Sequence, residues 1–293
     1  MAYLKVGSEN STPINLYFED HGQGVPVVLI HGWPLNSRSW EKQLPALLDA
    51  GFRVITYDRR GFGQSTQCTI GFDSQTLASD LNILMTELNL HNAILVGFSM
   101  GGVEVAKYLS SFGTDRTQKA VFVSSVTPFL LKSEDNPEGA EASAFENIRK
   151  KLIADRPQFL THFFKDFYNA GYFEKVSEEA IHASWIHGIM ASPVATLKSV
   201  DTWLVDLRAD LKSIKIPTLV IHGDMDKTVP VKASGSRMSQ FLENCEYQQL
   251  ISAPHGLIWT HSDEFNEMLL KFTADSAGNT VKLSSAEQEL GLH

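Results

Sequence analysis

Short apolar runs, each bounded by turn-forming residues, recur along most of the chain. Six of them, mostly of continuous hydrophobicity, lie at residues 25–30, 53–57, 93–96, 120–124, 218–222 and 246–251. Continuous rather than alternating hydrophobicity is typical of strands that are buried on both faces of a sheet. Two earlier segments, residues 4–6 and 14–18, alternate instead, and they predict an antiparallel hairpin at an edge of the sheet.

Helical patterns fill the stretches between these strands, at residues 39–50, 74–88, 100–112, 232–242 and 263–272. Parallel neighbours in a sheet need a long crossover connection, which is usually a helix. The alternation of strands and helices therefore predicts an α/β protein with a mainly parallel, eight-stranded sheet and helices on both of its faces.

The alternation of strand and helix patterns stops between Thr127 and Lys215. This stretch is rich in aromatic residues and has the pattern of several helices without a strand. We interpret residues 128–214 as a helical cap inserted between two parts of the core, residues 1–127 and 215–274. After residue 274 the apolar content falls, and residues 275–293 are expected to form a C-terminal extension.

Bulk properties exclude several classes of function. The net charge of -9 argues against a nucleic-acid partner, because phosphate binding requires clustered Lys and Arg. The doublet Arg59-Arg60 is interpreted as a solvated face. The two cysteines, Cys68 and Cys245, form no metal or haem motif, so no metal and no cofactor are expected. There is no secretory signal and no apolar stretch near the ~18 residues of a membrane span, so a cytoplasmic protein without a membrane partner is expected.

A candidate nucleophile follows the apolar run at 93–96. The chain continues there as Gly-Phe-Ser-Met-Gly at 97–101, which matches the G-x-S-x-G motif, and a helical pattern follows. In such an elbow the strand turns sharply into the helix and exposes the serine hydroxyl, here that of Ser99, at the carboxyl end of the sheet. A glycine-rich turn with a helix-capping serine is the alternative. The strand before and the helix after favour the elbow.

A serine hydroxyl needs a positioned base, which in this arrangement follows in the chain order Ser, Asp or Glu, His. Asp226 lies just after the run at 218–222, and His255 lies just after the run at 246–251. Both positions are loops at the carboxyl ends of strands, where an open α/β sheet binds its ligands. Asp224 is the rival acid, although it is also placed to stabilise the turn after Gly223. His222 is interpreted as a turn or core histidine.

The oxyanion of an acyl-transfer intermediate needs backbone donors. One donor is expected from the residue after the nucleophile, Met100, and the second from Trp33 in the loop after the run at 25–30. The alternative interpretation of Trp33 is a large aromatic residue of the core, and its side chain is also placed to form a wall of the pocket.

Several motifs together resemble one family. They are His-Gly-Trp-Pro-Leu at 31–35, Tyr-Asp-Arg-Arg-Gly-Phe-Gly at 57–63, Gly-Phe-Ser-Met-Gly-Gly at 97–102, Asp-Asn-Pro-Glu-Gly at 135–139 and Ala-Pro-His-Gly at 253–256. As a set they resemble the cofactor-free bacterial haloperoxidases, which are α/β-hydrolases also described as perhydrolases and have aryl esterase and γ-lactamase relatives. The resemblance covers nearly the whole chain to about residue 273. It implies the α/β-hydrolase fold and a catalytic triad of Ser99, Asp226 and His255.

The resemblance also implies a mechanism without a cofactor. Ser99 would form an acyl-enzyme with a small carboxylic acid or ester, and peroxide would replace water in deacylation to give a peracid, which oxidises halide in solution. The Trp33 carbonyl, held by Pro34, would aim at the bound peroxide; stiffening of the loop is the plainer role of Pro34. By matching positions the substrate pocket would be lined by Trp33, Phe62, Val126, Phe163, Trp203 and Val229. Family members form trimers, so a homo-oligomer is expected.

Other functions would preserve much of this pattern. A γ-lactamase, which hydrolyses a cyclic amide, would use the same triad with a different pocket, so its substrate would be a lactam. A non-catalytic ligand-binding protein on the same fold is a remote alternative, because such a protein need not keep all three triad residues. A hydroxynitrile lyase would also keep the triad, whereas dehalogenases with an aspartate nucleophile are excluded by Ser99.

Overall fold

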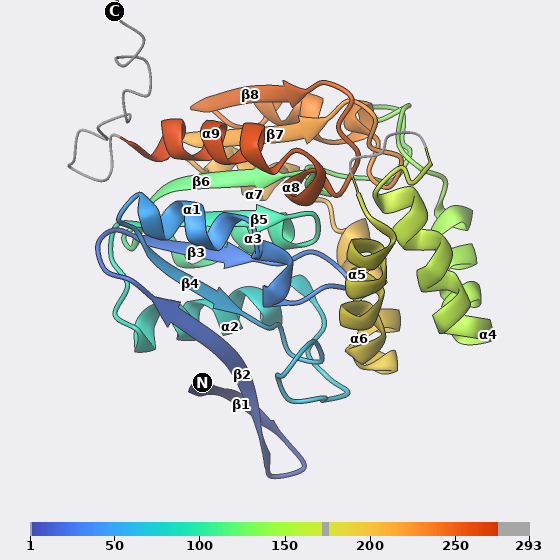
Figure 1. Cartoon of the computed structure of the whole chain (residues 1–293), viewed down its shortest axis with the longest axis horizontal. Coiled ribbons are helices and arrows are strands. Elements are labelled where there is room, and N and C mark those ends of the chain that lie inside the picture. The colour runs from blue at the N-terminus through green and yellow to red at the C-terminus, as the bar shows by residue number, and fades with distance from the viewer. Residues whose placement is uncertain (1, 172–175, 275–293) are drawn as a thin grey trace, which may run out of the picture.

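One sheet of eight strands runs through the computed structural model, which describes residues 2–171 and 176–274 (Figure 1). Its order is β1-β2-β4-β3-β5-β6-β7-β8. The strands are β1 (Ala2–Glu9), β2 (Thr12–His21), β3 (Pro26–Ile30), β4 (Arg53–Tyr57), β5 (Ala93–Phe98), β6 (Thr117–Val123), β7 (Thr218–Gly223) and β8 (Cys245–Leu250). β1 pairs antiparallel with β2, and β2 pairs antiparallel with β4. The other strand pairs are parallel.

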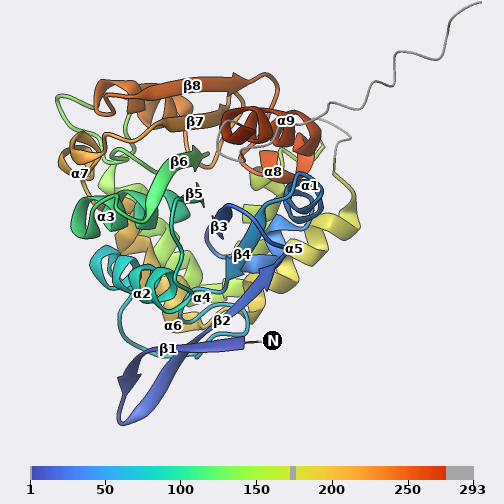
Figure 2. The same cartoon turned by 90° about the vertical axis from the view of Figure 1, so that its left-hand side faces the viewer.

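Central strands are buried along their whole length. Every residue of β3, β5 and β7 is buried, which is why these segments have continuous rather than alternating hydrophobicity. The hairpin of β1 and β2 forms one edge of the sheet and extends away from the rest of the molecule (Figure 2). The prediction of an eight-stranded, mainly parallel sheet with an antiparallel edge hairpin is confirmed.

Helices cover both faces of this sheet, as predicted (Figure 2). One face is covered by α2, α3 and α7, and the other by α1, α8 and α9. Their bounds are α1 (Gln43–Asp49), α2 (Ser74–Glu87), α3 (Gly101–Phe112), α7 (Arg208–Ser213), α8 (Leu257–Thr260) and α9 (Ser262–Thr273). The segment predicted as a helix at 39–50 is divided into a short 3₁₀ helix, η1 (Ser37–Trp40), and α1.

Three further helices lie beyond the carboxyl ends of the parallel strands (Figure 1). These are α4 (Ala142–Phe167), α5 (Glu178–Met190) and α6 (Pro193–Lys198), followed by the 3₁₀ helix η2 (Ser199–Leu204). α4 is kinked at Asp155, whose backbone is non-helical because Pro157 cannot continue the helix, and the Asp155 carboxylate caps the second half at Gln158. The division into core and cap at residues 127 and 214 stays a prediction, and the expected extension at 275–293 lies outside the described residues.

One predicted helix is wrong. Residues 232–242 form two 3₁₀ segments, η3 (Val231–Ala233) and η4 (Gly235–Gln240), instead of an α-helix. The chain breaks at Ser234, whose φ and ψ of -132° and -100° are not helical. Gly235 then passes so close to His222 that a Cβ there would lie 2.5 Å from the imidazole Nδ1. Close packing against the sheet, rather than helical periodicity, determines the backbone conformation of this segment.

A buried ion pair ties the loop after β4 to α2. Arg60 Nε and Nη2 donate to the two carboxylate oxygens of Asp80, each at 2.6 Å, and both side chains are almost fully buried. The interpretation of Arg59-Arg60 as a solvated face is therefore wrong for Arg60, and Arg59 is also buried. Single-sequence patterns do not show which arginines find a buried carboxylate.

This ion pair gives a stability prediction. Asp80→Leu should lower the free energy of unfolding by about 3–5 kcal/mol, because it leaves the Arg60 guanidinium buried without a partner. The double variant Arg60→Met/Asp80→Leu should recover much of that loss, since neither charge is then buried. Urea denaturation of the three proteins measures both values. A double variant less stable than Asp80→Leu would contradict this account.

Candidate active site

Ser99 lies at the junction of β5 and α3 with a backbone φ of +54°. This left-handed conformation is strained for a residue with a Cβ and is found mainly at functional sites. Two glycines make the turn possible. A Cβ on Gly97 would lie 2.6 Å from the Gly101 carbonyl oxygen, and a Cβ on Gly101 would lie 2.4 Å from the Ile30 carbonyl oxygen. The helix can therefore begin directly against the sheet, as the motif predicts.

The structure brings Ser99, His255 and Asp226 together at the carboxyl ends of β5, β8 and β7. His255 Nε2 lies 3.0 Å from Ser99 Oγ, and His255 Nδ1 lies 2.7 Å from Asp226 Oδ2. All three residues are buried, with Ser99 5% exposed. Since the carboxylate can only accept, Nδ1 carries the hydrogen and Nε2 is left to accept the hydroxyl proton of Ser99. This geometry is that of a base between a nucleophile and an orienting acid.

Four donors surround the Asp226 carboxylate. Oδ1 accepts hydrogen bonds from the N–H groups of Thr228 and Val229 at 2.9 and 2.7 Å, and Oδ2 is shared by His255 Nδ1 and His222 Nε2, the latter at 3.1 Å. Burial alone would raise the pKa of Asp226, but electrostatic attraction to the His255 imidazole and the hydrogen bonds with His222 and His255 outweigh it and lower this pKa to about 2. The carboxylate is thus held as an anion.

Asp224, the rival acid, is placed differently. Its backbone N–H donates to the Leu250 carbonyl at 3.1 Å, and its side chain makes no hydrogen bond to His255 within the described part of the chain. The geometry therefore favours Asp226 over Asp224. His222 is a buried core residue, which agrees with one of the two interpretations of the sequence. Sequence reasoning missed its contact with Asp226. The four-residue spacing between His222 and Asp226 was the available signal.

The loop after β3 is held by a buried network of polar groups. Arg59 Nη2 donates to the His31 carbonyl at 2.7 Å, and the Arg59 backbone N–H donates to His31 Nε2 at 3.0 Å. The Arg59 guanidinium also pairs with Glu104 on α3, which in turn accepts a hydrogen bond from the Tyr57 hydroxyl. Burial and the nearby Arg59 charge hold the pKa of His31 well below its usual value. Sequence reasoning missed this network and misassigned Arg59.

The network positions the two candidate oxyanion donors. It connects the His31-Gly32-Trp33 loop to the helix that begins beside Ser99. In the described part of the chain, no hydrogen bond involves the backbone N–H of Trp33 or of Met100. Unpaired N–H groups beside a nucleophile are what an oxyanion hole requires. The Trp33 indole is itself fixed by a hydrogen bond to the Thr196 carbonyl at 3.1 Å.

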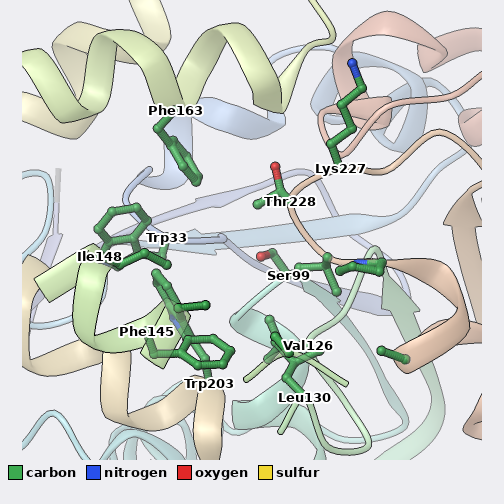
Figure 3. A pocket seen from close by; sticks show the side chains of 15 residues that line it. Trp33, Ser99, Val126, Leu130, Phe145, Ile148, Phe163, Trp203, Lys227 and Thr228 are labelled. Atoms are coloured by element: carbon green, nitrogen blue, oxygen red, sulfur yellow. The ribbon is translucent and has the colours of Figure 1, made fainter. Parts of the chain in front are cut away.

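A cavity of about 230 Å³ opens beside Ser99 between the sheet and α4 (Figure 3). Its walls are mostly apolar, and Phe163 and Trp33 meet edge to face with ring centroids 5.1 Å apart. Five residues predicted for the pocket line it: Trp33, Val126, Phe163, Trp203 and Val229. Sequence matching missed the other lining residues, which are Leu130, Ala140, Ala144, Phe145, Ile148, Lys227, Thr228, Pro230 and Ala233.

Phe62 is the exception among the predicted pocket residues. Its side chain is fully buried and packs on the His31 ring at 5.6 Å and beside the Arg59 guanidinium at 5.7 Å, away from the cavity. The turn that begins at Arg59, closed by the Phe62 N–H donating to the Arg59 carbonyl, directs the ring under the loop after β3. Phe62 therefore supports the oxyanion loop instead of lining the pocket.

A second, more polar groove of about 510 Å³ adjoins the cavity. It runs along α4 past Lys151, Gln158 and His162. Four residues line both spaces: Ile148, Phe163, Lys227 and Thr228. The apolar cavity thus meets a polar groove close to Ser99.

Neither a metal-binding cluster nor a membrane-spanning helix occurs among the described residues. No cluster of three or more His, Cys, Asp or Glu side chains in residues 2–171 and 176–274 could hold a metal ion. Within the same ranges, no helix is both long and apolar enough to cross a bilayer.

Comparison with known proteins supports the resemblance along nearly the whole chain. The family model for the alpha/beta hydrolase fold matches residues 25–262. A Synechocystis sp. protein that is provisionally named a non-heme chloroperoxidase is 50% identical over 274 residues. These residues cover 93% of this chain and 99% of that protein. A bifunctional esterase/perhydrolase of Acinetobacter calcoaceticus is 34% identical, covering 88% of this chain and 96% of the relative. The crystal structure of bromoperoxidase from Bacillus anthracis is 49% identical, with a TM-score of 0.90 over 94% of this chain and 99% of that one.

The two acidic residues after β7 give a direct test of the site. Asp226→Asn should lower kcat for ester hydrolysis by about 10⁴-fold, because an amide at this position favours the wrong tautomer of the histidine. Asp224→Asn, the matched control two residues away, should have a much smaller effect. Steady-state kinetics with p-nitrophenyl acetate measure both. A larger loss in Asp224→Asn than in Asp226→Asn would reverse the assignment of the acid.

Proposed function

Because the chain belongs to the α/β-hydrolase family, we propose that it is a serine hydrolase that acts on small carboxylic esters and also performs perhydrolysis. The observation that carries the proposal is the hydrogen-bonded series from Ser99 Oγ through His255 to Asp226 at a strained strand–helix turn. The relatives named as non-heme chloroperoxidase, bromoperoxidase and esterase/perhydrolase support the same chemistry.

In the first half of the proposed reaction, Ser99 Oγ attacks the carbonyl carbon of the ester. His255 Nε2 accepts the hydroxyl proton, and the imidazolium that forms is stabilised by the Asp226 carboxylate. The negative charge on the carbonyl oxygen is stabilised by the N–H groups of Trp33 and Met100. His255 then returns the proton to the alcohol, which leaves Ser99 acylated.

In the second half, water or hydrogen peroxide attacks the acyl carbon. His255 removes a proton from the attacking oxygen and passes it to Ser99 Oγ as the acyl–oxygen bond breaks. Water gives the carboxylic acid. Peroxide gives the peracid, with its O–O bond intact, so no electron is transferred on the enzyme. Oxidation of halide by the peracid then takes place in solution.

The cavity limits the acyl groups that the enzyme accepts. Its volume of about 230 Å³ and its walls of Trp33, Phe145 and Trp203 favour small, apolar acyl groups. The polar groove past Lys151 and His162 offers a path for the alcohol to leave. A homo-oligomer, a trimer by the family resemblance, and a cytoplasmic location remain predictions.

The first test removes the nucleophile. Ser99→Ala should lower ester hydrolysis by at least about 10³-fold, since the base then has no hydroxyl to activate. Its melting temperature should stay close to that of wild type, because the hydroxyl's one side-chain partner is His255 among the described residues. Esterase assays and thermal denaturation provide the two readouts. Activity within tenfold of wild type would exclude Ser99 as the nucleophile.

The second test separates water from peroxide as acyl acceptors. Pro34→Leu should change the ratio of peracid to acid more than total acyl turnover, because Pro34 fixes the Trp33 carbonyl that would accept a hydrogen bond from peroxide. Both products are quantified across a peroxide titration in wild type and variant. An unchanged ratio would leave Pro34 as a stiffener of the loop. Absence of peracid from the wild type would favour a plain esterase or a lactamase.

A further inference from the structure

His222 is a second histidine in contact with the Asp226 carboxylate. It is the penultimate residue of β7, four residues before Asp226, and its side chain has no solvent exposure. Its Nε2 lies 3.1 Å from Asp226 Oδ2 and 3.0 Å from the Val229 carbonyl oxygen. Two imidazoles from different elements thus contact the Oδ2 atom, that of His222 on β7 and that of His255 in the loop after β8.

The partners of His222 define its protonation. A carboxylate oxygen and a carbonyl oxygen both only accept hydrogen bonds, so Nε2 must carry the hydrogen that points at them. Nδ1 is buried and has no hydrogen-bond partner among the described residues. A hydrogen on Nδ1 would be a buried donor without an acceptor, which is costly. The geometry therefore assigns His222 the neutral Nε2–H tautomer.

The surroundings leave the His222 ring little freedom to move. Gly235 of η4 passes over it, and even a Cβ at that position would lie 2.5 Å from Nδ1 and 2.9 Å from the His222 Cβ. The glycine thus allows η4 to lie directly against the imidazole. A ring held this tightly presents its Nε2–H in one direction, toward the Val229 carbonyl oxygen, with Asp226 Oδ2 beside it at 3.1 Å.

We propose that His222 is a positioning residue, which fixes the orientation of the Asp226 carboxylate toward His255. The proposal rests on the proposed function, in which Asp226 is the acid that orients the base. The backbone N–H groups of Thr228 and Val229 hold Oδ1, so the position of this backbone sets the rotation of the whole carboxylate about its Cβ–Cγ bond. The His222 Nε2–H donates to the carbonyl of Val229 and thereby fixes that backbone. Its nitrogen also lies 3.1 Å from Oδ2, the oxygen that His255 binds.

Three substitutions separate this role from simple core packing. His222→Gln can place an amide N–H close to the position of Nε2, whereas the amide of His222→Asn is too short and reaches only the position of Nδ1. His222→Leu fills the space without a donor. We expect kcat for p-nitrophenyl acetate to fall about tenfold in the Leu and Asn variants, the size of one buried hydrogen bond. KM should change little, and Gln should restore most of kcat.

The order of rescue is the decisive outcome of the kinetics. Equal losses in Gln and Asn, or losses that follow thermal stability alone, would mean that His222 only packs the core. Unchanged kcat in a folded His222→Leu protein would also overturn the proposal. Activity that survives in Ser99→Ala is a separate result, because it contradicts the proposed function rather than the role of His222.

A measurement on the wild-type protein does not depend on whether the variants fold. With ¹⁵N-labelled histidine, NMR distinguishes the two nitrogens of each ring, and through-bond correlation to the backbone identifies the resonances of His222. The expected result is a neutral ring with hydrogen on Nε2. A hydrogen on Nδ1 alone would overturn the proposal, because Nε2 could then not donate to the Val229 carbonyl beside Asp226.

Discussion

The close approach of α3 to the sheet is the constraint on which the rest of the site depends. The helix begins so near β3 that Gly101 has no room for a side chain against the Ile30 carbonyl. This approach forces Ser99 into a left-handed conformation and places its hydroxyl at the carboxyl end of the sheet. It also brings the start of α3 beside the loop after β3, which supplies the second candidate oxyanion donor. One steric condition thus brings together the candidate nucleophile and the candidate oxyanion donors.

Buried charged groups then fix the parts that the turn brings together. Glu104 on α3 pairs with Arg59, which holds His31 and so the oxyanion loop. Asp226 lies among four donors, and their combined effect keeps a fully buried carboxyl group ionised despite the cost of burial. Such networks are rigid because removing any one partner leaves a buried charge or donor without its match. Rigidity is what a preorganised site for acyl transfer needs.

Sequence patterns predicted the sheet, the elbow and the candidate triad because each rests on local chemistry. Gly97, Ser99 and Gly101 form a contiguous motif, and Asp226 and His255 each follow directly after a predicted strand. Phe62, Arg59 and His222 were misplaced or incompletely assigned for the opposite reason. The role of Arg59 depends on Glu104, a partner that is distant in the chain. The role of Phe62 depends on the direction of its ring, which the backbone turn sets and the sequence pattern does not show. The helix predicted at 232–242 is likewise interrupted where Gly235 packs against His222 of β7.

In the proposed mechanism, Ser99 carries the acyl group in both hydrolysis and perhydrolysis. Rapid-quench mass spectrometry after mixing with p-nitrophenyl acetate detects this acyl group. We expect an acetyl adduct that maps to Ser99 and decays faster as peroxide is added, with peracetic acid appearing at the same rate. An adduct on another residue, or peracid formed without consumption of a Ser99 adduct, would contradict the mechanism.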